Sequence, residues 1–178
     1  MHSKIYLVRH GQSMANIKID DGGYDSPLTL VGREQVKKVI LDVDLIICSP
    51  MRRTLETFYY SKITGKDVVV DHDFRERQCE QADLLLIKYM PDGSISLFEG
   101  LGEESEELFR ERIIRVSEKL YEYSLTYKNI AVICHGCVIR ELTGEKLDNA
   151  EIIEITQKQL IDIINRQTVI LPSCCSYF

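Results

Sequence analysis

Short apolar runs alternate along this chain with longer amphipathic segments, and this alternation predicts its elements. Runs of four or five residues that are rich in β-branched side chains and closed by turn-forming residues are typical of buried strands. We predict such strands at residues 4–8, 44–48, 67–70 and 130–134. Between them, apolar residues recur at the three- and four-residue steps of amphipathic helices. Strands that alternate with helices in this way predict an α/β fold.

The predicted helices begin at polar or proline residues. Thr29 follows a turn at 25–28 and is expected to cap a helix that runs to about residue 41. Ser49-Pro50 is expected to open a second helix, which runs to about residue 62. The clearest helix covers residues 103–123, with an apolar face formed by Leu108, Phe109, Ile113, Val116, Leu120 and Tyr123. Its first turns carry Glu103, Glu104, Glu106 and Glu107, which we interpret as capping of the positive end of the helix dipole.

The pattern is less decisive in two places. Leu84–Ile87 fits either a helical turn or a strand, and a turn follows at 91–93. Near the C-terminus, the apolar segments 152–155 and 160–164 predict a hairpin, and only a short helix is expected between it and residue 134. With no repeats and no low-complexity linker, the chain is expected to form one domain.

Composition limits the partners that the protein can have. The 178 residues suffice for one substantial core, and the 44% hydrophobic and 28% charged content is ordinary for a globular protein. A net charge of −6 argues against a nucleic-acid-binding surface, although a local group of arginines could still bind an anionic substrate. No run of 18 apolar residues and no signal-like start is present, so we expect a cytoplasmic protein without a membrane span.

The six cysteines do not form a convincing metal motif. Cys48 and Cys134 lie in apolar strand-like runs, where a reduced cysteine behaves as a small hydrophobic residue. Residues 134–137 have C-x-x-C spacing but lack a matching second pair, so we expect no metal. The adjacent Cys174 and Cys175 near the C-terminus are expected to be reduced.

The candidate chemistry lies at the ends of two predicted strands. Arg9-His10-Gly11 follows the first strand, and His135-Gly136 follows the strand at 130–134. In open α/β sheets, functional residues gather at the carboxyl ends of the strands. The two His-Gly pairs can meet only if both strands lie in one sheet and end at the same edge.

Further motifs follow in an order that resembles the histidine phosphatase superfamily, which also contains the cofactor-dependent phosphoglycerate mutases. The resemblance runs from about residue 4 to 155. It is carried by Arg9-His10-Gly11 with Asn16, Asp25-Ser26-Pro27-Leu28-Thr29, Ser49-Pro50 with Arg52, Glu76, Gly102-Glu103-Glu104-Ser105, and His135-Gly136. It implies a three-layer α/β sandwich with a mostly parallel central sheet, in one domain over residues 1–178. Within it we expect a small cap-like insertion at about 77–102 and a short hairpin and tail at about 149–178.

The resemblance also implies catalytic roles. His10 would be the nucleophile that attacks phosphorus and forms a phosphohistidine. Arg9, Arg52 and His135 would surround the phosphoryl oxygens and stabilise their charge. Glu76 would protonate the leaving alcohol and then help to activate water. No metal or other cofactor is implied, because side chains supply the positive charge.

The resemblance further implies that a second group of residues binds the substrate: Arg9, Gly11, Asn16, Arg52, Arg77 and Gly136. We interpret Arg53 as a structural or surface residue. The chain departs from the family pattern after Glu76, where residues 77–80 replace a glycine-containing stretch, and after Gly136, where the following helix and loop are short.

These features favour a small phosphatase that acts on phosphomonoesters, with a small phosphorylated molecule as substrate. A mutase must enclose its substrate under a cap with extra cations, whereas the segment after Arg77 offers Lys88 as its only further basic residue up to residue 102. Mutase-type phosphoryl transfer and a protein phosphatase acting on phosphohistidine or phosphoserine remain alternatives. The sequence does not identify the natural substrate or the oligomeric state.

Overall fold

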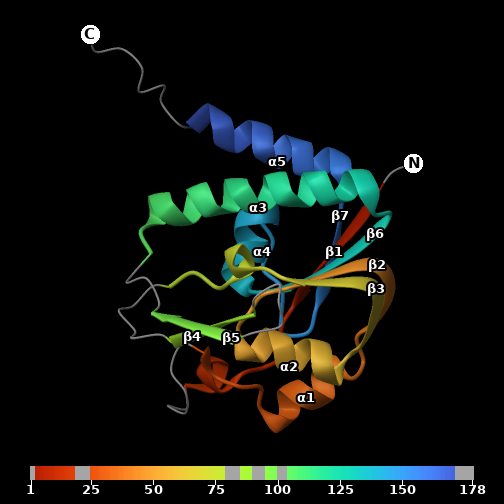
Figure 1. Ribbon diagram of the computed structural model, residues 1–178, viewed down its shortest axis with the longest axis vertical. Helices are drawn as coiled ribbons and strands as arrows, with labels where there is room; N and C mark the ends of the chain where they lie inside the picture. Colours follow the sequence, from red (N-terminus) through yellow and green to blue (C-terminus); the bar gives the residue numbers. More distant parts are fainter. Residues whose placement is uncertain (1–2, 19–24, 79–84, 90–94, 100–103, 171–178) are drawn as a thin grey trace.

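The computed structural model describes residues 3–18, 25–78, 85–89, 95–99 and 104–170, and its centre is a five-stranded sheet (Figure 1). The strands are β1 (Lys4–Arg9), β2 (Ile40–Cys48), β3 (Lys62–Val70), β6 (Asn129–Cys134) and β7 (Ile152–Thr156), in the order β3-β2-β6-β1-β7. β1, β2, β3 and β6 run parallel, and β7 is antiparallel to β1 at one edge. The predicted, mostly parallel sheet is confirmed.

Helices cover both faces of this sheet. α1 (Leu30–Val36) and α2 (Arg52–Tyr60) lie on one face, below the sheet in Figure 1. α3 (Glu106–Thr126), α4 (Gly136–Thr143) and α5 (Gln157–Ile170) lie on the other. The predicted three-layer α/β sandwich is therefore confirmed. None of the helices in the described ranges is both long and apolar enough to cross a membrane.

The apolar strand runs are explained by burial on both faces. In β2, Leu45 and Ile47 pack with the α3 side of the core, whereas Ile46 and Cys48 pack on the opposite side. Successive side chains of a strand point to opposite faces, so a strand covered on both faces needs apolar residues at every position. This is why the central strands read as continuous apolar segments in the sequence.

Several boundaries differ from the prediction. β2 and β3 begin earlier than predicted, at Ile40 and Lys62. The first half of β3 is largely exposed and lacks an apolar run, whereas residues 40 and 41 at the start of β2 fall in the range predicted for the preceding helix. α1 ends at Val36, before β2 begins. α2 begins only at Arg52, where the Asp25 carboxylate accepts the backbone N–H at 2.7 Å.

The long helix α3 forms as predicted, with Ser105 as its N-cap and a buried face that includes Phe109 and Ile113. The acidic residues of its start have different roles. Glu106 and Glu107 lie in the first turn, whereas Glu104 is buried before it in an ion pair described below, and residue 103 lies outside the described residues. Leu108 was assigned to the apolar face but is 56% exposed, because it lies beside that face rather than on it.

The predicted C-terminal hairpin is wrong. Residues 152–156 form β7, but residues 157–170 form α5, which packs against α3. Thr156 and Gln159 begin this helix with a reciprocal pair of hydrogen bonds, Gln159 N–H to Thr156 Oγ1 at 3.3 Å and Thr156 N–H to Gln159 Oε1 at 2.8 Å. Leu160 and Ile163, three residues apart, are both buried, which is a helical spacing and not that of a strand.

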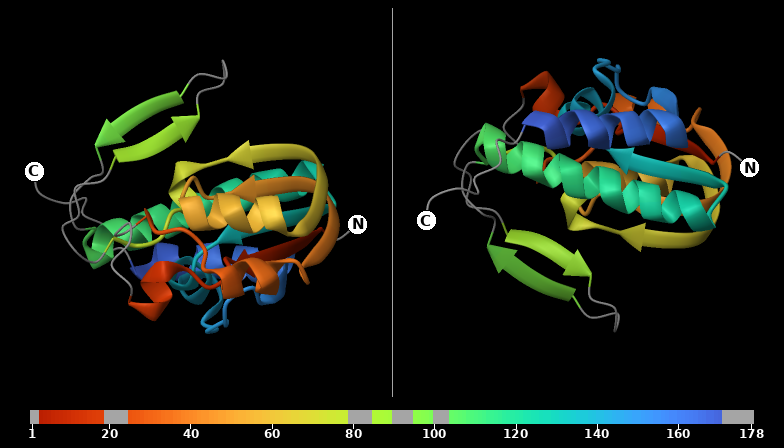
Figure 2. Two further views of the ribbon diagram at one scale, coloured as in Figure 1. Left: turned by 90° about the horizontal axis from the view of Figure 1, so that it is seen from below. Right: turned by 90° about the horizontal axis from the view of Figure 1, so that it is seen from above.

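The ambiguous segment contains a second, two-stranded sheet. β4 (Leu85–Tyr89) pairs antiparallel with β5 (Ile95–Glu99), so the strand alternative holds here. Figure 2 shows this hairpin projecting from the side of the molecule. Residue 84 and the predicted turn at 91–93 lie outside the described residues, as do Cys174 and Cys175.

The loop after β1 lies directly against α1, and a glycine at position 32 permits this contact. A Cβ atom on Gly32 would lie 2.0 Å from the carbonyl oxygen of Gln12. The Thr29 N–H also donates to that oxygen, at 2.9 Å. The start of α1 is therefore docked on the loop that carries His10.

We predict that Gly32→Ala destabilises the protein by about 1–3 kcal/mol, because the methyl group would overlap backbone atoms and force α1 away from this loop. The measurement is the free energy of unfolding by urea denaturation. The control is Leu30→Ala in the same helix, at a residue that is 78% exposed, which should change stability by less than about 0.5 kcal/mol. Equal stability of the two variants would contradict the proposed contact.

Candidate active site

β1 and β6 end side by side, and this brings the two predicted histidines together. Arg9, the last residue of β1, lies opposite Cys134, the last residue of β6. His10 and His135 follow these positions, and their ring centroids are 5.2 Å apart. The structure thus places both His-Gly pairs at the same carboxyl edge of the sheet, as predicted.

The hydrogen bonds of His10 define the state of its ring. Nδ1 lies 2.7 Å from the carbonyl oxygen of Gly11, which can only accept, so Nδ1 carries the proton. Nε2 therefore carries the lone pair, and it accepts from Nε of Arg53 at 3.3 Å. Burial and then the Arg53 charge lower the pKa of His10 to about 3. The imidazole is neutral at physiological pH, and Nε2 is available as a nucleophile.

His135 is also a buried, neutral imidazole. It precedes the first turn of α4, and its Nε2 lies 2.8 Å from the hydroxyl of Ser49. Burial, followed by the charge of Arg53, holds its pKa well below the usual range. Its other ring nitrogen, Nδ1, is buried and has no hydrogen-bond partner within the part of the chain that the structure describes.

The arginine beside His10 is Arg53, and not the predicted Arg52. Arg53 is only 5% exposed, whereas the side chain of Arg52 is 58% exposed and pairs with Glu56 at 2.9 Å. The reason is the phase of α2: Arg53 and Thr57, four residues apart, lie on its buried side, and Arg52 and Glu56 lie on the outer side. The interpretation of Arg53 as a mere structural or surface residue is corrected accordingly.

Arg9 extends from the end of β1 toward the loop after α4. Its Nη1 donates to the carbonyl oxygen of Leu147 at 2.5 Å, and its buried Nε has no hydrogen-bond partner among the described residues. Gly136 lies against this guanidinium, since a Cβ there would be 3.3 Å from Arg9 Nε. The glycine of the second His-Gly pair therefore leaves room for the arginine of the first.

Glu76 reaches the same edge of the sheet from the segment after β3. One carboxylate oxygen, Oε1, accepts the backbone N–H of Cys137 in the first turn of α4 at 3.2 Å and that of Arg77 at 3.1 Å. The positive end of the α4 dipole favours a carboxylate at this position. This bond places Glu76 at the start of α4, where its partner Cys137 comes two residues after His135.

Two predicted substrate-binding residues make contacts within the protein. The Gly11 N–H donates to Thr57 Oγ1 at 3.1 Å. Asn16 lies in a short 3-10 helix, η1 (Met14–Ile17), and its Oδ1 accepts from the Ser13 N–H and from Asn149 Nδ2. Asn149 also donates to the His10 carbonyl oxygen at 3.1 Å. These bonds connect Asn16 to the backbone of His10 and hold the loop in place.

Arg77 lies beside a buried ionic cluster. Its guanidinium stacks on the ring of Phe109, with Cζ 5.5 Å from the ring centroid. Arg112 stacks on the same ring and holds Glu104 through two hydrogen bonds of 2.7 and 2.5 Å, while Arg75 binds that carboxylate at 3.2 Å. Burial by itself raises the pKa of Glu104, but the Arg112 bonds and the arginine charges bring it below its usual value.

Arg112 also fixes the segment that carries Glu76. Its Nη1 donates to the carbonyl oxygens of Asp73 and Arg75, at 2.6 and 2.8 Å. A fully buried guanidinium therefore ties α3 to the backbone just before Glu76.

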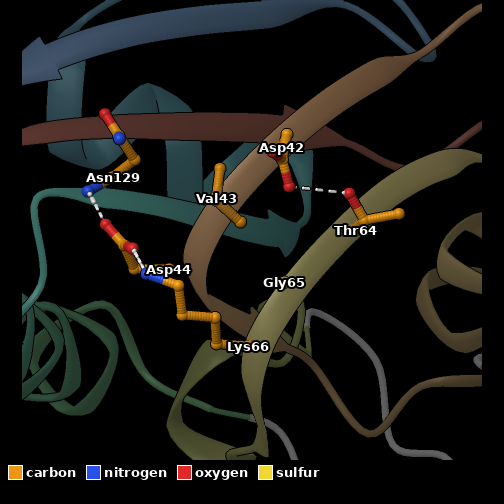
Figure 3. Close-up of a pocket in the computed structure, with 7 residues that line it drawn as sticks. All are labelled: Asp42, Val43, Asp44, Thr64, Gly65, Lys66 and Asn129. Atoms are coloured by element: carbon orange, nitrogen blue, oxygen red, sulfur yellow. Dashed lines mark hydrogen bonds and ion pairs between the residues drawn. The ribbon is translucent and has the colours of Figure 1, made fainter.

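A pocket of about 310 Å³ lies toward the opposite ends of the strands, but its polar groups already satisfy one another. Figure 3 shows Asp44 between Lys66 and the backbone of Asn129, and Asp42 bonded to Thr64. Within the described ranges, no three His, Cys, Asp or Glu side chains are arranged to hold a metal ion. The carboxyl edge with its two histidines is therefore the candidate active site.

Sequence reasoning missed two residues of this site, Arg53 and Ser49. For Arg53, the available signal was the helical phase, because Thr54 and Thr57 share its buried side. For Ser49, the signal was its position directly after β2, the same position that His10 and His135 occupy after their strands.

The comparisons with known proteins agree with this fold. The model of the family described as histidine phosphatase superfamily (branch 1) matches residues 5–160. The structure of a putative α-ribazole-5′-P phosphatase from Escherichia coli is similar, with a TM-score of 0.63 at 21% identity, over 86% of this chain and 90% of that one. A phosphoglycerate mutase from Bacillus anthracis gives a TM-score of 0.55 at 16% identity, over 91% of this chain and 96% of that one.

A phosphoserine phosphatase from Entamoeba histolytica, solved with 3-phosphoglyceric acid, gives a TM-score of 0.55 at 18% identity, over 85% and 89% of the two chains. No curated protein matches the sequence. The structural likenesses, all at low identity, show a shared fold, and the family model covers most of the chain with both His-Gly pairs inside it. The chain therefore belongs to the histidine phosphatase superfamily, branch 1.

Proposed function

We propose that this protein is a metal-independent phosphatase that hydrolyses phosphomonoesters through a phosphohistidine on His10. The observation that carries the proposal is the state of the His10 ring. Its proton is held on Nδ1 by the Gly11 carbonyl, and its Nε2 lone pair lies beside the Arg53 guanidinium. A neutral imidazole with its nucleophilic nitrogen next to a buried cation is suited to attack on a phosphoryl group.

In the first step, the Nε2 lone pair of His10 forms a bond to phosphorus as the bond from phosphorus to the ester oxygen breaks. The ring then carries a phosphoryl group on Nε2 and a proton on Nδ1, so positive charge develops on it. The Gly11 carbonyl oxygen, 2.7 Å from Nδ1, stabilises that charge. The same contact keeps the ring in one orientation throughout the reaction.

The charge on the transferred phosphoryl oxygens is assigned to Arg9, Arg53 and His135. Arg9 Nε and His135 Nδ1 are buried nitrogens without a hydrogen-bond partner in the described residues, and phosphoryl oxygens would supply acceptors for both. Arginine guanidinium groups suit the spread charge of a phosphoryl transition state. In this proposal Arg53 replaces Arg52 as the second phosphate-binding arginine.

Glu76 is assigned as the general acid and base. Protonated Glu76 would give its proton to the departing alcohol, and the resulting carboxylate would take a proton from water as the water oxygen attacks phosphorus. The bond from phosphorus to Nε2 then breaks, and phosphate and neutral His10 are released. Anchoring of the carboxylate on the N–H of Cys137 supports this assignment, because it fixes Glu76 at the start of α4 beside His135.

The proposed substrate is a small phosphorylated molecule. Phosphatase activity is favoured over mutase activity because the insertion at about 77–102 contains only Lys88 as a basic residue beyond Arg77. An assay of phosphate release across sugar phosphates, phosphoglycerates, nucleotides and phosphopeptides tests this preference. Phosphoryl transfer between phosphoglycerates that depends on 2,3-bisphosphoglycerate, with little phosphate release, would instead indicate a mutase.

We predict that His10→Ala abolishes turnover, with a loss of at least about 10³-fold in kcat, because it removes the Nε2 that attacks phosphorus in this proposal. The measurement combines phosphate release with an alkaline denaturing quench, which should trap a base-stable phosphoenzyme in the wild type alone; later acid treatment should release its phosphate. Treatment of the wild type with a chelator should leave its activity unchanged. A trapped phosphoenzyme in His10→Ala, or activity that a divalent metal restores after chelation, would contradict the proposal.

The adjacent arginines provide a matched pair of variants. Arg53→Ala should lower kcat/KM by about 10²–10³-fold, because it removes a buried cation from the transferred phosphoryl group. Arg52→Ala removes the same side chain one position away, from the exposed side of α2, and should change kcat/KM by less than about threefold. Circular dichroism checks that both variants are folded. A greater loss in Arg52→Ala than in Arg53→Ala would refute the assignment.

We predict that the effect of Glu76→Gln depends on the leaving group. Glutamine cannot donate the proton, so phosphorylation by an alkyl phosphate should slow by about 10²–10⁴-fold. p-Nitrophenyl phosphate leaves without protonation and should lose much less in this step. Single-turnover kinetics on the two substrates, side by side, make the comparison. Equal losses on both would show that Glu76 is not the general acid.

A further inference from the structure

Ser49 is a buried hydroxyl at the carboxyl end of β2, directly beside the active site. It is fully buried, and its N–H donates to the Ile133 carbonyl oxygen at 3.0 Å, which fixes Ser49 against the end of β6. From this position its Oγ lies 2.8 Å from Nε2 of His135. None of the catalytic steps above uses Ser49, so its contact with His135 needs a separate explanation.

The direction of the bond between Ser49 and His135 follows from the remaining contacts of the hydroxyl. The Met51 N–H donates to Ser49 Oγ at 3.4 Å, so the oxygen already accepts one hydrogen bond there. Within the described residues, His135 Nε2 is the only acceptor that the hydroxyl proton reaches. The Ser49 hydroxyl therefore donates to Nε2, and this nitrogen carries the lone pair.

A neutral imidazole has one ring proton, so the lone pair on Nε2 puts the proton of His135 on Nδ1. That nitrogen is buried without a hydrogen-bond partner in the described part of the chain, in a ring that lies 5.2 Å from the His10 ring. A buried donor without an acceptor is costly, and a bound phosphoryl oxygen would remove that cost. The opposite tautomer would present a lone pair to the negatively charged phosphoryl oxygens instead.

We propose that Ser49 is a positioning residue that holds His135 as the Nδ1–H tautomer, so that this neutral imidazole donates a hydrogen bond to the phosphoryl group. This proposal rests on the proposed function and adds to it the reason why His135 Nδ1 carries a proton that it can donate. Burial and the neighbouring Arg53 keep His135 uncharged, so it cannot donate from both nitrogens. Selection of the tautomer by Ser49 thus decides whether His135 attracts or repels the substrate phosphate.

The direct test is nitrogen-15 NMR of the imidazole rings. The chain has four histidines, and the His135 signals are assigned by their loss in His135→Ala. In the wild type, His135 Nδ1 should show the shift of a protonated nitrogen and Nε2 that of an unprotonated one. Addition of inorganic phosphate should shift the Nδ1–H proton resonance. A wild-type Nε2–H tautomer would overturn the proposal without any variant of Ser49.

Ser49→Ala should raise the population of the Nε2–H tautomer and lower kcat by about 10–100-fold, as loss of a residue that orients a catalytic imidazole does. Ser49→Thr keeps the hydroxyl and should keep the Nδ1–H tautomer. The matched control is Thr54→Val, which removes a neighbouring buried hydroxyl that donates to the backbone carbonyls of Ser49 and Met51. An unchanged tautomer in Ser49→Ala, or the same change in Thr54→Val, would overturn the proposal.

A double-mutant cycle separates positioning from a general structural effect. In the His135→Ala background, Ser49→Ala should cause no further loss of kcat, because the hydroxyl acts only through this imidazole. A full additional loss would mean that Ser49 acts in another way. The tautomer is measured independently of turnover, so an Nδ1–H tautomer in a protein that forms no phosphohistidine would refute the proposed function and leave the tautomer assignment intact.

Discussion

The parallel pairing of β1 with β6 is the interaction on which the active site depends. It brings together residues 9 and 134, which are far apart in the sequence, and so places His10 and His135 at one edge of the sheet. The sheet is buried on both faces, so its register is fixed by the packing of every strand residue. A shift of one residue would turn apolar side chains to the wrong face and separate the two imidazoles.

Burial at this edge gives the two histidines their chemistry. An imidazole exposed to water would be partly protonated near neutral pH, whereas burial beside Arg53 keeps both rings neutral. In each ring, one nitrogen is held by a partner outside the phosphate site: the Gly11 carbonyl for His10 and the Ser49 hydroxyl for His135. In the proposed mechanism, these contacts prepare one ring as the nucleophile and the other as a hydrogen-bond donor before substrate binds.

The carboxylate of the site depends on a separate network. Glu76 follows a segment that has little regular structure, and a buried guanidinium fixes this segment to α3. Arg112 binds the Glu104 carboxylate and two backbone carbonyls, so one side chain connects α3, Glu104 and the backbone just before Glu76. Removal of one partner of such a buried pair costs about 3–5 kcal/mol, which makes the network a condition for both stability and the placement of Glu76.

The sequence by itself determined the fold class, the central strands and the two strand-end histidines. A strand that is buried on both faces needs a continuous apolar run, and two of these strands end directly before His10 and His135. Tertiary structure decided the rest. Residues 160–164 form a helix because their apolar side chains pack against α3, and no local pattern distinguished this from a strand. Arg53 faces His10 and Arg52 faces solvent because the point at which α2 begins sets its rotation, and Asp25, distant in sequence, lies at that point.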